Sequence, residues 1–132
     1  MELVRAPTTD ASRVLEVTVT AALNAGVTTI ATVTNQPCII ESVVLYANAA
    51  AHADMTTCAI EGGASQVVTF ISTTDAVEAN LDAIDEQVAW TGVVRLAATK
   101  TITIDLQGDG STAANLTVSI VYRPAAAGGY LA

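Results

Sequence analysis

Basic residues and aromatic rings are scarce in this sequence. Its 132 residues include 5 Lys and Arg against 13 Asp and Glu, for a formal net charge of −8, with one Phe, one Trp and three Tyr. A domain that binds nucleic acid needs clustered positive charge, so we expect no nucleic-acid partner. Sugar-binding sandwiches present rows of exposed aromatic rings, and the rings here are too few and too scattered to favour that class.

Long apolar runs are also missing. The longest are interrupted by Thr, Asn or Glu well before the roughly 20 residues that a membrane-spanning helix needs. Residues 1–10 contain one Arg and no apolar stretch, so we do not expect them to be a secretory signal peptide. These features predict no membrane partner.

Cysteine and histidine, the commonest residues of reactive sites, are few. Cys38 and Cys58 are the two cysteines, and without a signal peptide two reduced, buried thiols are favoured over a disulfide. His52 lies in an Ala-rich connection, where an exposed loop histidine is favoured over a catalytic base. The spacing of these three residues does not suit a zinc site.

Acidic residues cluster without the aromatic neighbours that grip a substrate. Asp82, Asp85 and Glu86 therefore favour a solvated acidic face over a pair of catalytic carboxylates. Asp105 and Asp109 border a Gly-Asp-Gly segment that favours a hairpin turn, with a calcium loop as the alternative. We expect no enzymatic activity and no cofactor.

Apolar and polar residues alternate along most of the chain. Leu15, Val17 and Val19 lie on one face of an expected strand, and its other face is polar. Further strands are expected over residues 27–33, 38–47, 55–60, 65–71, 87–91, 93–96, 101–106 and 115–123. About eight short strands separated by turns predict an all-β protein. It would be a single-domain antiparallel β-sandwich, jelly-roll or Greek-key-like, with extended terminal arms.

One segment departs from this alternation. Residues 75–86 carry Val77, Leu81 and Ile84 at spacings of four and three, together with five acidic residues. The spacing suits a short helix, and the charge suits an acidic loop laid over the sheet. The sequence does not separate the two.

The two ends of the chain lack alternation. We divide it into an N-terminal arm (1–12), a β-sandwich domain (13–123) and a C-terminal tail (124–132). The ends still carry residue types that serve as binding anchors, so we expect at least one of them to order on a partner, with frayed termini as the alternative. The candidate contacts are Leu3, Val4, Arg5, Tyr130 and Leu131.

The segment 38–47 is apolar on both faces, as in a strand covered on both sides. Homo-oligomers bury such faces symmetrically, so we expect a homo-oligomer. Val44, Tyr46 and Trp90 are the candidate interface residues, and a core position is the alternative for Trp90.

Four segments, residues 24–31, 36–45, 101–106 and 114–122, together resemble the small β-sandwich structural proteins of tailed bacteriophages, in particular the capsid decoration (cement) class. The resemblance lies in the residue composition and the order of the strands, and it involves no diagnostic motif. It implies a trimer on the outer surface of a virion capsid, made in the host cytoplasm, that clamps the major capsid protein through its arms and the base of the sandwich. The alternative is a carbohydrate- or receptor-binding sandwich of a phage tail or fibre.

Overall fold

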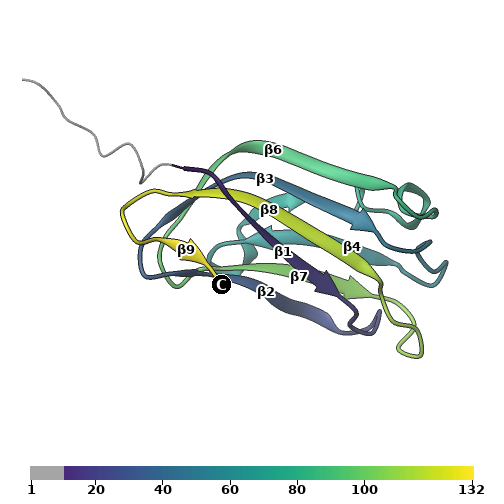
Figure 1. Cartoon of the computed structure of the whole chain (residues 1–132). Coiled ribbons are helices and arrows are strands. Elements are labelled where there is room, and N and C mark those ends of the chain that lie inside the picture. The colour runs from purple at the N-terminus through teal and green to yellow at the C-terminus, as the bar shows by residue number, and fades with distance from the viewer. Residues whose placement is uncertain (1–10) are drawn as a thin grey trace, which may run out of the picture.

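Two antiparallel β-sheets pack face to face in the computed structural model, which describes residues 11–132 (Figure 1). The first sheet contains, in spatial order, β1 (Arg13–Val19), β8 (Leu116–Pro124), β3 (Cys38–Ala47) and β6 (Gln87–Leu96). The second contains β5 (Val68–Ile71), β4 (Thr57–Gly62), β7 (Thr101–Gln107), β2 (Gly26–Thr34) and β9 (Tyr130–Leu131).

The chain crosses from one sheet to the other at every connection except the one between β4 and β5. Neighbouring strands are therefore far apart in sequence, as when β1 pairs with β8. The all-β, antiparallel sandwich that the sequence predicts is confirmed.

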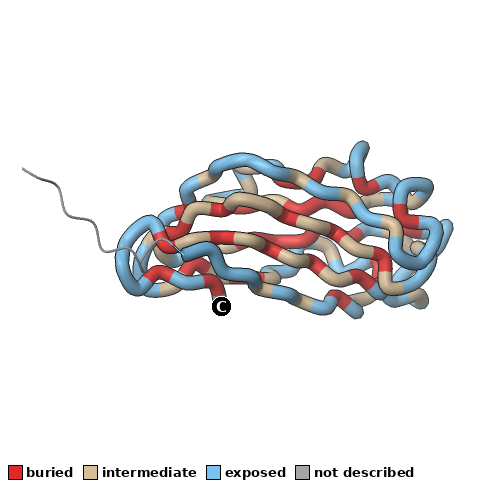
Figure 2. The backbone as a smooth tube through the Cα atoms, turned by 45° about the horizontal axis from the view of Figure 1, so that its top comes forward, coloured by how far each residue is buried: buried red, intermediate tan, exposed pale blue. Residues whose placement is uncertain are grey.

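The core lies between the sheets and consists of the side chains at every second position of the strands. On β8 the inward side chains Leu116, Val118, Ile120 and Tyr122 are buried, while the residues between them are partly exposed. Figure 2 shows this alternation of buried and partly exposed positions along the strands. Complete burial of one Ile or Leu stabilises the fold by about 1.5–3 kcal/mol.

Both cysteines belong to this core and are unpaired, as expected. Burial raises the pKa of the Cys58 thiol to about 12, and the nearby Asp105 carboxylate adds to the effect. Burial also raises the pKa of Cys38.

The expected break between residues 91 and 93 is wrong, because β6 runs through Gly92 as one strand. The pairing of β3 with β6 and with β8 shifts register between Ile40 and Ser42, so the irregularity falls within the strand. A Cβ atom at position 92 would lie 2.5 Å from the Trp90 ring. Glycine is needed here because the indole folds back over the backbone.

Residues 75–86 form an acidic loop with one short 3₁₀ turn, Glu78–Asn80, and no α-helix. Leu81 is fully buried and anchors the loop, whereas Ile84 is 64% exposed. The Ser72 hydroxyl accepts a hydrogen bond from the Asp75 N–H. Of the two interpretations left open by the sequence, the loop is confirmed.

The C-terminal tail folds back onto the sandwich, so the extended arm expected at this end of the chain is wrong. Tyr130 and Leu131 form β9 beside β2, and Thr32 and Ala132 exchange backbone hydrogen bonds of 2.8 and 3.0 Å. Leu131 is only 5% exposed and belongs to the core. The sequence does not predict β9 because a strand of two residues is too short to show alternation of apolar and polar side chains.

Candidate interaction surfaces

The single histidine lies in an exposed loop beside a carboxylate. Its Nδ1 atom accepts a hydrogen bond from the Asp54 N–H at 3.1 Å and lies 3.2 Å from Asp54 Oδ2, with both side chains about half exposed. A catalytic imidazole would instead lie next to a nucleophile, and both thiols are buried in the core. Over residues 11–132, no three His, Cys, Asp or Glu side chains come together in a way that could hold a metal ion.

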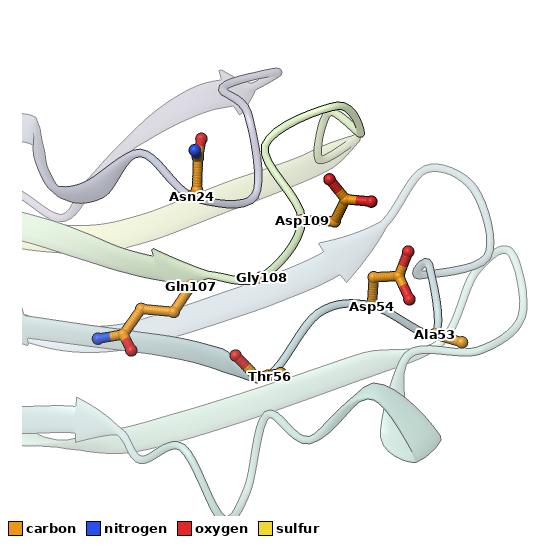
Figure 3. Close-up of a pocket in the computed structure, with 7 residues that line it drawn as sticks. All are labelled: Asn24, Ala53, Asp54, Thr56, Gln107, Gly108 and Asp109. Carbon is orange, nitrogen blue, oxygen red and sulfur yellow. The ribbon is translucent and has the colours of Figure 1, made fainter.

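An open cleft of about 630 Å³ lies at the end of the sandwich where β7 ends. Figure 3 shows that Asp54 and Asp109 belong to two different loops that line the cleft. Its lining residues are Asn24, Ala53, Asp54, Thr56, Gln107, Gly108 and Asp109. The loops here pack so closely that a Cβ atom at position 108 would lie only 2.4 Å from the Asp54 carbonyl oxygen.

The Asp109 carboxylate is held by its own turn. Its Oδ1 atom accepts hydrogen bonds from the N–H and the hydroxyl of Ser111, both at 2.9 Å. These donors lower the pKa of Asp109. The connection is not the expected hairpin, because β7 and β8 belong to different sheets. Asp105 lies within β7, paired with Val27 and Ala59, so the two carboxylates do not share one loop.

The outward face of the first sheet holds two of the three residues predicted for a subunit interface. Val44 is the register partner of Ser119 on β8 and of Ala89 on β6. Tyr46 lies two residues further along, and its hydroxyl donates a hydrogen bond to the Asp85 carboxylate, which raises the pKa of Tyr46. Beside them is a shallow groove of about 470 Å³, lined by Glu16, Val44, Tyr46, Asn48, Gln87, Thr117 and Ser119.

Apolar side chains extend along the same face. Val14 of β1 is 64% exposed and Val93 of β6 is 73% exposed. Ile39 and Val121 lie between them on β3 and β8 and are partly exposed. Glu41, Ser42 and Arg123 lie among these side chains, so the face is mixed, with exposed apolar side chains interspersed among polar ones.

The third predicted interface residue, Trp90, points into the sandwich. It packs against Phe70 of β5 at the side of the molecule where β5 and β6 approach each other. The indole is only partly buried, so its part in a subunit interface stays a prediction.

The predicted terminal contacts separate into three groups. Leu3, Val4 and Arg5 fall outside the residues that the structure describes. Leu131 is in the core, so its side chain contacts its own chain. Tyr130 is 42% exposed on the outer side of the second sheet, and its role as a partner contact stays a prediction.

No helix within residues 11–132 has the length and apolar character required to span a bilayer.

No family model and no curated protein matches the chain. Among solved structures it is similar to a chain of the cyanophage Pam1 capsid asymmetric unit, with a TM-score of 0.57, 14% identity, and coverage of 94% of this chain and 92% of that one. It is also similar to a chain of the acid-stable capsid of Helicobacter pylori bacteriophage KHP30, with a TM-score of 0.52, 10% identity, and coverage of 92% and 98%. The resemblance drawn from the sequence is thereby confirmed as a shared fold.

Proposed function

We propose that this protein is a structural, non-enzymatic virion component of a tailed bacteriophage that decorates the capsid surface by binding the major capsid protein lattice. The observation that carries the proposal is the end-to-end similarity to chains of two phage capsids, which covers more than nine-tenths of each partner. Because each match covers nearly all of the matched chain, this sandwich corresponds to nearly the whole of that chain and not to one part of it.

The surface of the sandwich supports a role in assembly. Val44, its register partner Ala89 on β6 and Tyr46, two residues further along β3, form an apolar part of the outward face of the first sheet. A protein used for its surfaces needs such a face, whereas an enzyme needs a preorganised set of reactive groups. We expect copies of the chain to associate through this part of the face, around Val44 and Tyr46, and the phage resemblance favours a trimer.

The test is cosedimentation with capsid particles that were assembled without this protein from the major capsid protein of the same phage. Saturable binding, with a fixed number of copies per lattice position seen by cryo-electron microscopy, is the expected result. Absence from the pellet at every salt concentration would refute the proposal.

One observation favours the alternative function, recognition of a carbohydrate receptor. The groove beside Tyr46 places an aromatic ring among amide, hydroxyl and carboxylate groups, which are the groups that bind sugars. A glycan array separates the two functions. Specific glycan binding that Tyr46→Ala abolishes, without capsid binding, would establish the receptor-binding role instead.

A further inference from the structure

Positive charge gathers at one end of the sandwich. Among residues 11–132 all Lys and Arg side chains lie at the end where β1 and β3 begin and β6 and β8 finish, on the left in Figure 1. We call this the basic end, and its cations are Arg13, Arg95, Lys100 and Arg123. The antiparallel order of the first sheet brings them together from positions up to 110 residues apart.

The opposite end is acidic. Its three longer loops, residues 48–56, 72–86 and 108–115, contain seven carboxylates and no Lys or Arg. We call this the acidic end, and its carboxylates are Asp54, Asp75, Glu78, Asp82, Asp85, Glu86 and Asp109. The folded chain is therefore electrically polar along the direction of its strands.

Two arginines at the basic end frame an apolar contact. Arg95 of β6 and Arg123 of β8 are both register partners of Ile39 on β3, so the three side chains form one row on the outward face. Val93, two residues before Arg95 on the same strand, is 73% exposed. We call Ile39, Val93, Arg95 and Arg123 the Arg–apolar patch.

Within residues 11–132 the positive charges of the patch are only partly neutralised. Glu41 lies 3.8 Å from the Nε atom of Arg123, with both side chains about one-third exposed, and it also accepts a hydrogen bond from the Ser12 hydroxyl at 2.7 Å. Within residues 11–132, Glu61 of β4 also lies toward this end, on the second sheet. Within the part of the chain that the structure describes, Arg95 has no carboxylate within 4.0 Å.

We propose that the Arg–apolar patch docks onto an acidic protein surface, in which carboxylates pair with Arg95 and Arg123 around a central apolar contact. The inference rests on the proposed function, because the acidic surface is then that of the capsid lattice. Arginine is among the residues enriched at interface hot spots. The seven carboxylates of the acidic end repel the same surface, so the charge polarity also orients the protein, with its basic end toward the capsid.

The test compares two double variants of the full chain with the same change in net charge. Arg95→Ala with Arg123→Ala removes two positive charges from the patch, and Ala79→Glu with Ala83→Glu adds two negative charges at exposed positions of the acidic end. Binding to capsid particles assembled without the protein is measured at about 0.05 M and about 0.3 M salt, between which screening changes strongly.

The patch variant should bind about tenfold more weakly at low salt and should lose most of the salt dependence of the wild-type chain. The acidic-end variant should stay within about twofold of wild type, and Arg95→Lys with Arg123→Lys should recover part of the affinity because it keeps the charge. Unchanged circular dichroism and unfolding midpoints establish that all variants fold.

Three outcomes would overturn the inference. The first is wild-type affinity in the patch variant, and the second is an equal loss in both double-charge variants, which would indicate a net-charge effect. The third is duplex DNA binding that depends on Arg95 and Arg123. If the patch variant binds capsids as well as the wild-type chain does, the patch proposal fails and the proposed function stands. If the wild-type chain binds capsids at no salt concentration, the patch proposal and the proposed function both fail.

Discussion

Trp90 of β6 packs edge-to-face against Phe70 of β5, with ring centroids 4.9 Å apart and planes at 71°. These rings lie at the edges of different sheets, so the pair closes one side of the sandwich. Phe70 is only 4% exposed, so its ring is part of the buried core. A chain with a single Phe and a single Trp has used both at this junction.

We predict that Phe70→Ala lowers the free energy of unfolding by about 3–5 kcal/mol, since it empties a buried aromatic site. A double-mutant cycle with Trp90→Ala should give a coupling of about 0.5–1.5 kcal/mol, which is typical of edge-to-face pairs. Urea denaturation of the four proteins measures both quantities. Strictly additive losses would show that the two rings stabilise the fold independently.

The second prediction concerns β9. Leu131→Ala should lower the free energy of unfolding by about 2–3 kcal/mol, because Leu131 is buried between the sheets. Tyr130→Ala is the control from the same strand, and it should cost less than about 1 kcal/mol because its side chain is 42% exposed. Equal, small effects in thermal and urea unfolding would mean that the tail is not part of the cooperative fold.

Alternating side chains predict well where the strands lie along the sequence. They do not predict which strands pair, because tertiary contacts determine the pairing. The alternation of Leu116, Val118, Ile120 and Tyr122 identifies β8, because one face of that strand must be buried. Its pairing with β1 could not be foreseen, because Val14 and Val121 meet across more than 100 residues of chain. For the same reason the row of Arg95, Ile39 and Arg123 is invisible in the sequence.

The candidate site was predictable only in part. The two-sided apolar character of residues 38–47 predicts a strand covered on both faces. In the structure Val44 and Tyr46 lie on the outward, partly exposed face, and their cover by another subunit stays a prediction. The same reasoning could not place Trp90, because alternation gives a side chain a face but does not say which face is inward. The exposed Val14 and Val93 were missed, since a valine that faces outward has the same local pattern as one that faces the core.

The third prediction follows from the thiol of Cys58, whose pKa in the folded protein is raised to about 12. An unfolded cysteine ionises near pH 8.5, so between these values only the unfolded state loses the proton. The stabilising effect of the buried thiol is complete below the unfolded pKa and is lost as pH rises toward the folded one. The free energy of unfolding should therefore fall between about pH 9 and pH 11, with a slope of up to about 1.4 kcal/mol per pH unit from this group.

Cys58→Ala is the matched variant for this test. It is less stable at neutral pH because it leaves a small cavity, but its unfolding free energy should fall less steeply above pH 9. Thiol reagents should modify Cys38 and Cys58 only after denaturation, because both are buried. Parallel pH profiles of the two proteins, or rapid modification of the native chain, would contradict the prediction.

The last prediction concerns self-association through the outward face of the first sheet. Val44 lies at the centre of that face, with Ser119 and Ala89 as register partners, and its side chain is not part of the core. An aspartate here would place an unpaired charge in a subunit interface, at a cost of several kcal/mol. Val44→Asp should therefore convert the closed oligomer, expected to be a trimer, into monomer in sedimentation velocity at micromolar concentration.

Val67→Asp provides the matched control, because Val67 is 75% exposed in the turn before β5, outside the first sheet, and receives the same change in charge and volume. The control should keep the oligomeric state of the wild-type chain, which separates a specific interface from a general effect of added negative charge. A wild-type protein that sediments as a monomer would refute association through this face. Dissociation of both variants would instead show that net charge, which is already −8, controls assembly.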